Sequence, residues 1–298
     1  MQPQDCSATV ADRKIDFANR GVCRIRNWQH SWGSCTLLMG IVNVTPDSFS
    51  GDGVMPAGEA LKLALAQLEQ GATLIDIGGE STRPGYDPVP AREELNRVIP
   101  VIKALRAESA EAVISIDTTK ADVLRQAIAA GADILNSIWG LSDDLLLVVE
   151  EHKIPVVIMH NKEKPVYNQG GVVEHVLHFL LEHAEKAVRA GVRPENIILD
   201  PGIGFGKLAE HNLAVLSRLD RVVKLGFPTL LGTSRKSFIG KLTGQAVENR
   251  VFGSAAAVAL AIASGIDIVR VHDVSAMKDV VRVSDAIVRG NCSEEQEL

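Results

Sequence analysis

Apolar residues along this chain follow two patterns that alternate from about residue 36 onward. Short runs rich in β-branched residues and leucine alternate with longer stretches in which apolar residues recur at the period of a helix, such as Val98, Ile99, Ile102 and Leu105. Near-continuous apolar strands separated by helices indicate a parallel sheet that is covered on its faces. Eight strands in the α/β class fit a single closed (β/α)₈ TIM barrel better than an open doubly wound sheet. The predicted strands are 37–42, 74–77, 113–116, 134–135, 155–159, 197–199, 229–231 and 268–271.

Each of these apolar runs is followed by a polar or ionisable residue. A strand could simply end where polarity begins, but a purely structural barrel has no need of polar groups at every carboxyl end. Active sites of such barrels lie at that rim, so the pattern favours a site there. Asp76 lies inside the second strand, where we expect it to be buried and hydrogen-bonded. The residues at the strand ends are Asn43, Glu80, Asp117, Asn136, His160, Asp200, Ser234 and His272.

Three loops that follow predicted strands are rich in glycine, proline and hydroxyl groups: residues 43–53, 78–85 and 233–237. Loops of this kind are longer than ordinary strand-to-helix connections and are typical of lids and binding loops. Turn chemistry alone is the alternative interpretation, but turns do not require the Thr82-Arg83 or Arg235-Lys236 pairs.

The last predicted strand carries Arg270 and, two residues on, His272. Side chains alternate across a strand, so these two point the same way and form a compact donor pair for an oxyanion such as phosphate. A structural imidazole is the alternative for the histidine. We favour the anion site because Arg270 and Asp273 accompany it.

Other strand ends suggest recognition of a flat polar ring. Asp117 and Asn136 end neighbouring strands and can read donors and acceptors on a ring edge. The segment 200–207 matches neither a dinucleotide fingerprint nor a Walker loop, but Asp200 can accept from ring N–H groups and Phe205 can supply a wall. No Ser-His or Cys-His couple is evident, which favours binding and electrostatics over covalent catalysis.

Composition narrows the classes of partner. The chain has 298 residues and a formal net charge of −6, which argues against nucleic acid or an anionic membrane. The longest apolar stretch, 255–263, is far below the ~20 residues of a spanning helix, and the first 34 residues lack the apolar region of a signal peptide. The four cysteines are scattered, so we expect neither a zinc site nor a disulfide framework and predict a cytoplasmic protein.

Six segments of the chain carry a specific combination of these residues. They are 40–50 (GIVNVTPDSFS), 76–85 (DIGGESTRPG), 115–118 (SIDT), 200–207 (DPGIGFGK), 234–240 (SRKSFIG) and 270–272 (RVH). In this order, over about residues 36–289, the set resembles the dihydropteroate synthase family. The resemblance implies a (β/α)₈ barrel, usually a homodimer, that joins 6-hydroxymethyl-7,8-dihydropterin diphosphate to 4-aminobenzoate in folate biosynthesis. It further implies diphosphate as the second product, Mg²⁺ as cofactor and sulfonamides as competitors of the aminobenzoate.

The resemblance also implies a role for each matching residue. Catalysis is assigned to Asp117, Lys236 and Asn43, and Asn43 is the implied Mg²⁺ ligand. Pterin recognition is assigned to Asp117, Asn136, Asp200, Lys236 and Phe205. Diphosphate binding is assigned to Asn43, Arg270, His272, Thr82 and Arg83. The implied aminobenzoate site consists of Arg83, Pro84, Ser237, Arg235 and Lys236.

Three parts of the chain are expected. Residues 1–35 form an N-terminal extension whose first ~20 residues are expected from their composition to be disordered, and 24–28 could form a β-hairpin under the barrel. Residues 36–289 form the pterin-binding catalytic domain, and 290–298 form an acidic tail.

Two alternative functions stay open. A methyltetrahydrofolate:corrinoid methyltransferase shares a pterin platform of Asp and Asn, but it has no reason to keep a diphosphate pair. A catalytically inactive barrel could serve as a binding or scaffold subunit, although Asn43, Asp117, Lys236 and Arg270 argue against it.

Overall fold

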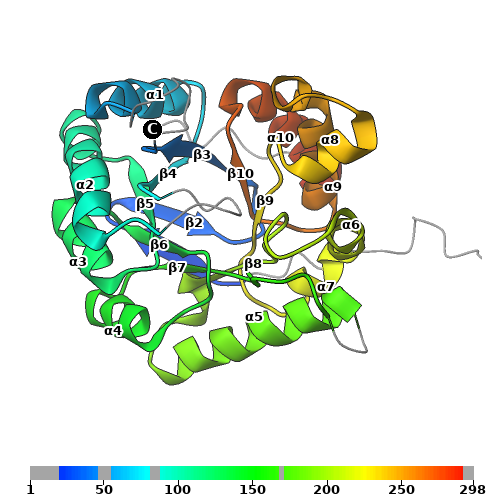
Figure 1. Ribbon diagram of the computed structural model, residues 1–298, viewed down its shortest axis with the longest axis horizontal. Helices are drawn as coiled ribbons and strands as arrows, with labels where there is room; N and C mark the ends of the chain where they lie inside the picture. Colours follow the sequence, from blue (N-terminus) through cyan, green and yellow to red (C-terminus); the bar gives the residue numbers. More distant parts are fainter. Residues whose placement is uncertain (1–19, 46–54, 81–87, 168–170, 291–298) are drawn as a thin grey trace, which may run out of the picture.

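Eight parallel strands form the centre of the molecule, as the apolar pattern predicts (Figure 1). The computed structural model describes residues 20–45, 55–80, 88–167 and 171–290. All of the strands predicted from the sequence are present, with ends that differ by at most two residues. They are β3 (Leu37–Asn43), β4 (Leu74–Gly78), β5 (Val113–Asp117), β6 (Ile134–Ser137), β7 (Val156–Met159), β8 (Ile197–Asp200), β9 (Leu230–Gly232) and β10 (Ile268–Val271).

The sheet closes on itself into a barrel. Its strands run in the order β8-β7-β6-β5-β4-β3-β10-β9, and all neighbouring pairs are parallel. Strands β8 and β9, at the two ends of that order, meet at a parallel bridge between Leu199 and Thr229. The backbone N–H of Leu199 also donates to the carbonyl of Pro228 at 2.8 Å. The predicted (β/α)₈ barrel is therefore confirmed.

Helices surround the barrel and cover the outer face of its strands (Figure 1). Each presents an apolar stripe inward, as α2 does with Val98, Val101, Ile102 and Leu105, all fully buried. The helices are α1 (Ala57–Glu69), α2 (Ala91–Glu108), α3 (Ala121–Ala130), α4 (Asp143–His152), α5 (Gly171–Arg189), α6 (Ala209–Leu216), α7 (Leu219–Val223), α8 (Ser237–Thr243), α9 (Val251–Ala263) and α10 (Val274–Arg289). Within the described part of the chain, none of them is long and apolar enough to cross a membrane.

An antiparallel hairpin of β1 (Val22–Ile25) and β2 (Trp28–Ser31) closes the amino end of the barrel. Cys23, Ile25 and Trp32 are buried against the residues that begin the eight strands, and the indole N–H of Trp32 donates to the carbonyl of Glu195 at 2.8 Å. The residues at the strand starts are Leu37, Met39, Leu74, Val113, Ile134, Val157, Ile198, Leu230 and Ile268.

The hairpin predicted near residues 24–28 is thus confirmed. Residues 1–19 and 291–298, for which disorder and an acidic tail are predicted, lie outside the described residues. The division at 35 and 290 into extension, catalytic domain and tail stays a prediction. Because the hairpin fills the amino end, the carboxyl end is the one left open to ligands.

Candidate active site

Strand register brings three of the predicted strand-end residues to one level of the barrel. Asn43 pairs with Gly78, Gly78 with Asp117, and Asp117 with Asn136 on successive parallel strands. Gly78 provides space between its two neighbours, since a Cβ there would lie 3.5 Å from Asp117 Cβ and 3.6 Å from Asn43 Oδ1. Polar side chains that are far apart in sequence therefore face one shared space.

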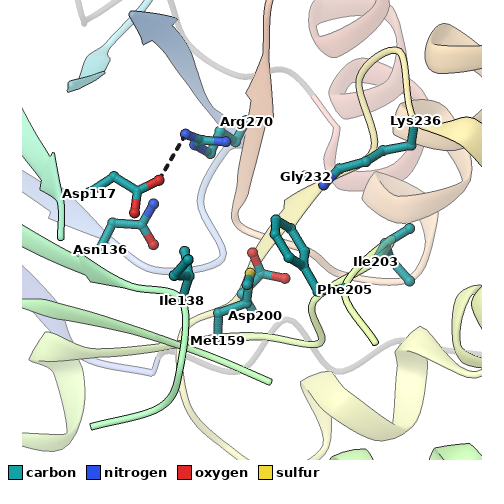
Figure 2. A pocket seen from close by; sticks show the side chains of 10 residues that line it. All are labelled: Asp117, Asn136, Ile138, Met159, Asp200, Ile203, Phe205, Gly232, Lys236 and Arg270. Carbon is teal, nitrogen blue, oxygen red and sulfur yellow. Dashed lines mark hydrogen bonds and ion pairs between the residues drawn. The ribbon is translucent and has the colours of Figure 1, made fainter. Parts of the chain in front are cut away.

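A small cavity opens at this end of the barrel (Figure 2). Six residues predicted for pterin or diphosphate binding line it, and the other lining residues are apolar or glycine. The full set is Asp117, Asn136, Ile138, Met159, Asp200, Ile203, Phe205, Gly232, Lys236 and Arg270.

A buried carboxylate organises one side of the cavity. Arg270 Nε donates to Asp76 Oδ2 at 2.6 Å, and Asn136 Nδ2 donates to the same oxygen at 3.0 Å. Asp76 is fully buried, which confirms the prediction that it is hydrogen-bonded inside its strand. Arg270 also reaches Asp117, with Nη2 3.4 Å from Oδ2 (Figure 2). Asp76 therefore positions an amide and a guanidinium that both face the cavity.

Asp117 lies in an environment that favours its protonated form. Burial and the nearby carboxylate of Asp76 raise the pKa of Asp117 to about 8, although the positive charge of Arg270 opposes this shift. At neutral pH the side chain is therefore largely a neutral acid, which can both donate and accept hydrogen bonds. A cation placed beside it would lower its pKa and favour the carboxylate.

The opposite side of the cavity combines a carboxyl group, an ammonium group and an aromatic ring. Asp200 Oδ1 accepts from the backbone N–H of Gly202 at 2.7 Å, and burial raises the pKa of Asp200 to about 6 in spite of this bond. Lys236 Nζ lies 3.9 Å from the centroid of the Phe205 ring (Figure 2). Such a cation over an aromatic face is attractive. Together these groups can read the polar edge of a flat ring and cover one of its faces.

His272, predicted to end the last strand, lies one residue beyond β10, the strand that carries Arg270, and does not line the cavity. Its Nδ1 is 3.1 Å from the hydroxyl oxygen of Ser234, to which its backbone N–H also donates at 3.1 Å. Burial and the charge of Arg270 lower the pKa of His272 to about 4. The imidazole is therefore neutral at pH 7, so an anion would meet one guanidinium charge and a neutral ring.

Two predicted aminobenzoate residues, Arg235 and Ser237, do not line the cavity. Arg235 pairs with the carboxylate of Asp273, with Nε 2.9 Å from Oδ2 and Nη2 bonded to the other oxygen. Ser237 is exposed at the first position of α8. Thr82, Arg83 and Pro84 lie outside the described residues.

The structure adds residues that the sequence did not mark. Ile138, Met159, Ile203 and Gly232 line the cavity. Each of them is the last residue of a strand or follows a strand within a few residues, and this position is the signal that could have located them. Lys207, the last residue of the glycine-rich segment 200–207, lies behind the cavity wall with Nζ 2.8 Å from the carbonyl oxygen of Gly202.

Comparison with known proteins agrees with this geometry. A family model described as "Pterin binding enzyme" matches residues 39–272. A curated dihydropteroate synthase from a Synechocystis species is 47% identical over 267 residues, which cover 87% of this chain and 92% of that protein.

Solved structures agree in fold as well as sequence. A Xanthomonas albilineans dihydropteroate synthase with 4-aminobenzoic acid superimposes with a TM-score of 0.81 at 44% identity, covering 87% of this chain and 95% of that one. A Yersinia pestis dihydropteroate synthase in complex with a sulfonamide drug gives a TM-score of 0.84 at 37% identity, covering 90% and 99%.

Proposed function

Since the chain belongs to the dihydropteroate synthase family of pterin-binding enzymes, we propose that its cavity binds the ring of 6-hydroxymethyl-7,8-dihydropterin diphosphate. The family's reaction is a transferase step of folate biosynthesis, in which that substrate and 4-aminobenzoate give 7,8-dihydropteroate and diphosphate. The observation that carries the proposal is the convergence of Asp117, Asn136, Asp200, Phe205 and Lys236 on one cavity.

Each of these groups has a chemical part in ring binding. Asp200 accepts from ring N–H groups when it is ionised, and Asn136 offers both a donor and an acceptor. Phe205 covers a face of the ring, and Lys236 donates to an acceptor at its edge. Asp76 keeps the amide of Asn136 turned towards the ligand through the 3.0 Å hydrogen bond to Nδ2.

Bond cleavage before attack suits this environment. The C–O bond to diphosphate breaks with its electron pair leaving on oxygen, and electron donation from the ring stabilises the resulting methylene cation. As that charge develops, Asp117 becomes more acidic, passes its proton to water or to the departing diphosphate, and offsets the charge as a carboxylate. The lone pair of the aniline nitrogen then forms the new C–N bond, and a proton on that nitrogen passes to water or to diphosphate.

Arg270 supports departure of the diphosphate. Its guanidinium is fixed by Asp76 at 2.6 Å and faces the cavity. A positioned guanidinium stabilises charge that develops on phosphate oxygens. His272 would add a neutral N–H donor, since its pKa is lowered to about 4. The predicted parts of Thr82, Arg83, Pro84, Arg235 and Ser237 in binding diphosphate or aminobenzoate stay predictions.

Mg²⁺ fits this site as an ion held mainly by substrate. Among the described residues, no group of three or more His, Cys, Asp or Glu side chains is arranged to hold a metal ion. Asn43 would supply its side-chain oxygen beside Asp117 across Gly78, and diphosphate and water would supply the other oxygen ligands. Bound there, the ion would neutralise charge on the diphosphate.

A diphosphate-release assay tests the proposed function. Mixing the pterin diphosphate with 4-aminobenzoate should release diphosphate in the presence of Mg²⁺, and chelation should abolish the signal. A sulfonamide should inhibit it competitively with 4-aminobenzoate, as expected for a relative of the sulfonamide-bound Yersinia pestis structure. Methyl transfer from methyltetrahydrofolate without diphosphate release would instead support the methyltransferase, and no turnover with either substrate would support a scaffold.

A homodimer is the second proposal for this chain. Helices α9 and α10 lie beside each other (Figure 1) and expose large apolar side chains, namely Phe252, Leu260, Val283 and Ile287 at 85%, 70%, 59% and 79% exposure. Exposed apolar side chains on two neighbouring helices suit a two-fold interface with a second copy. Phe252→Glu should convert a dimer to a monomer in sedimentation velocity, whereas Leu147→Glu, at an exposed leucine of α4, should not. A cytoplasmic location stays a prediction from composition.

A further inference from the structure

The loop that forms one wall of the cavity lies directly against the end of strand β7. Its glycines at 202 and 206 have φ angles of +67° and +56°. A Cβ at Gly202 would lie 1.8 Å from the carbonyl oxygen of His160, and one at Gly206 would lie 2.1 Å from that of Lys162. This close approach places the side chains of Ile203 and Phe205, which lie between the two glycines, on the cavity wall.

Lys207 binds this loop from behind. Its Nζ lies 2.8 Å from the carbonyl oxygen of Gly202, 3.1 Å from that of Phe205 and 2.8 Å from His160 Nδ1. An ammonium group has three N–H donors, and these three acceptors are the nearest to it, with the carbonyl oxygen of His160 further away at 3.5 Å. The two carbonyls bracket Ile203, so the lysine fixes the backbone on both sides of a cavity-lining residue.

The histidine beside Lys207 has a defined role in this network. His160 is fully buried, and burial together with the charge of Lys207 lowers its pKa to about 2, so its ring is neutral. For His160 Nδ1 to accept from Lys207, the proton must sit on Nε2. Nε2 lies 3.1 Å from His175 Nδ1, which accepts this hydrogen bond when the proton of His175 sits on its own Nε2, the nitrogen 3.4 Å from Lys162 Nζ. In this tautomer both ring nitrogens of His160 have a hydrogen-bond partner, because Nδ1 accepts from Lys207 and Nε2 donates to His175.

The charge of Lys207 acts on the cavity through Asp200. Gly202 donates its N–H to Asp200 Oδ1 and accepts at its carbonyl from Lys207, so one glycine contacts both groups. Burial lowers the pKa of Lys207 to about 7, with Asp200 opposing and Lys236 assisting this shift. The ionisable groups that act on this cluster are Asp200, Lys236, His160, His175, Lys162 and His178, with Arg270 acting on Asp200 from across the cavity.

We propose that Lys207 is a positioning residue for the pterin ring, which holds the wall of Ile203 and Phe205 in place and keeps Asp200 ionised from outside the cavity. The proposal rests on the proposed function, since it concerns the same ring site. Lys207 does not line the cavity, so it acts only through the loop and through Asp200. Removing its charge would loosen two carbonyls and raise the pKa of Asp200.

Two substitutions separate charge from packing. Lys207→Met keeps the length of the side chain without charge or donors, and Lys207→Arg keeps a permanent charge. For Lys207→Met we expect the KM for pterin diphosphate to rise about tenfold, while kcat changes less than about threefold. Lys207→Arg should recover most of the loss. Lys224→Met, at an exposed lysine of the surface, is the matched control and should leave both constants unchanged.

The pH profile distinguishes positioning from a purely structural role. Pterin affinity in the wild type should fall as pH drops through about 6, where Asp200 takes up a proton. In Lys207→Met this fall should begin about one pH unit higher, because the carboxylate of Asp200 loses the positive charge of Lys207. Weakening by the same factor at every pH would overturn the proposal, as would a KM and profile equal to those of the wild type.

Nitrogen NMR of the wild type provides a test that needs no variant. At pH 6.5, the ¹⁵N shifts of His160 should report a proton on Nε2 and a bare Nδ1. A proton on Nδ1 would mean that Lys207 is a neutral amine, and it would overturn the proposal even if the variants fail to fold. Diphosphate release by the wild type is measured alongside, so a failure of the proposed function is recognised separately.

Discussion

Asp117→Asn is the substitution that most directly tests how this site handles charge. Asp117 is nearly buried, and its pKa is raised from 3.8 to about 8 by burial and by Asp76. A carboxyl group with a raised pKa binds more protons in the folded than in the unfolded protein between about pH 4 and 8. The wild type should therefore lose stability as pH rises through this window. Asparagine cannot ionise, so the variant should not lose this stability as pH rises.

The size of the effect follows from the pKa of Asp117 in the folded and unfolded protein. A tenfold change in its acidity corresponds to ~1.4 kcal/mol, so the full difference between variant and wild type at pH 8 has an upper limit of about 5 kcal/mol. Arg270 can move closer to an ionised Asp117 than the present 3.4 Å, which reduces the cost. We expect the variant to be more stable by about 2 kcal/mol at pH 8, or roughly 4 °C in melting temperature, and nearly equal to the wild type near pH 4.

Activity should change in the opposite direction. The amide retains a hydrogen-bonding side chain in the ring site, but it cannot become a carboxylate when the ring gains positive charge. We expect kcat to fall about 100-fold while the KM for pterin diphosphate changes less than about threefold. The assays are thermal unfolding from pH 4 to 8 and coupled diphosphate release. A stability difference that does not grow with pH would refute a neutral Asp117, and unchanged turnover would refute its catalytic role.

Three further predictions concern other parts of the molecule. Lys236→Ala should weaken pterin binding about tenfold, because it removes a ring-edge donor and the cation over Phe205, and an unaltered calorimetric affinity would contradict this. Gly202→Ala should destabilise the fold by about 3 kcal/mol in denaturant unfolding, since its Cβ would lie 1.8 Å from a carbonyl oxygen at φ +67°; Gly58→Ala in α1, with nothing within 4 Å, should change stability by less than about 1 kcal/mol. His30 is buried with no hydrogen-bond partner at either ring nitrogen among the described residues, and burial lowers its pKa to about 4. Stability should therefore fall as pH drops from about 6.5 towards 4, by up to about 3 kcal/mol, and His30→Phe should remove this dependence if the reasoning holds.

The barrel could be predicted from sequence because its strands are short apolar runs with helical stretches between them. A strand such as β5, VISID, is buried on both faces and ends at Asp117, so pattern and boundary coincide. Closure at Leu199 and Thr229 could not be seen in any one segment, because it depends on how the twist of all the strands accumulates.

Only part of the candidate site could be predicted from the sequence, because the contacts within it depend on how separate strands are aligned. Residues at predicted strand ends are marked by their polarity, and Asp117, Asn136 and Asp200 do face the cavity, as does Arg270 from within β10. Which groups they contact depends on register between strands. The Asp76–Arg270 pair joins residues 194 positions apart, and no local pattern indicates it.

The hairpin at the amino end has a consequence for the order in which the molecule is built. It is among the first described segments to be synthesised, yet Trp32 bonds to Glu195 and Arg20 bonds to Asp267, partners 163 and 247 residues further along the chain. Contacts at such separation form slowly, and synthesis delays them further. Cys23, Ile25 and Trp32 therefore lack some of their final partners until β10 has been synthesised, so the hairpin can close the amino end only after the other strands have been made.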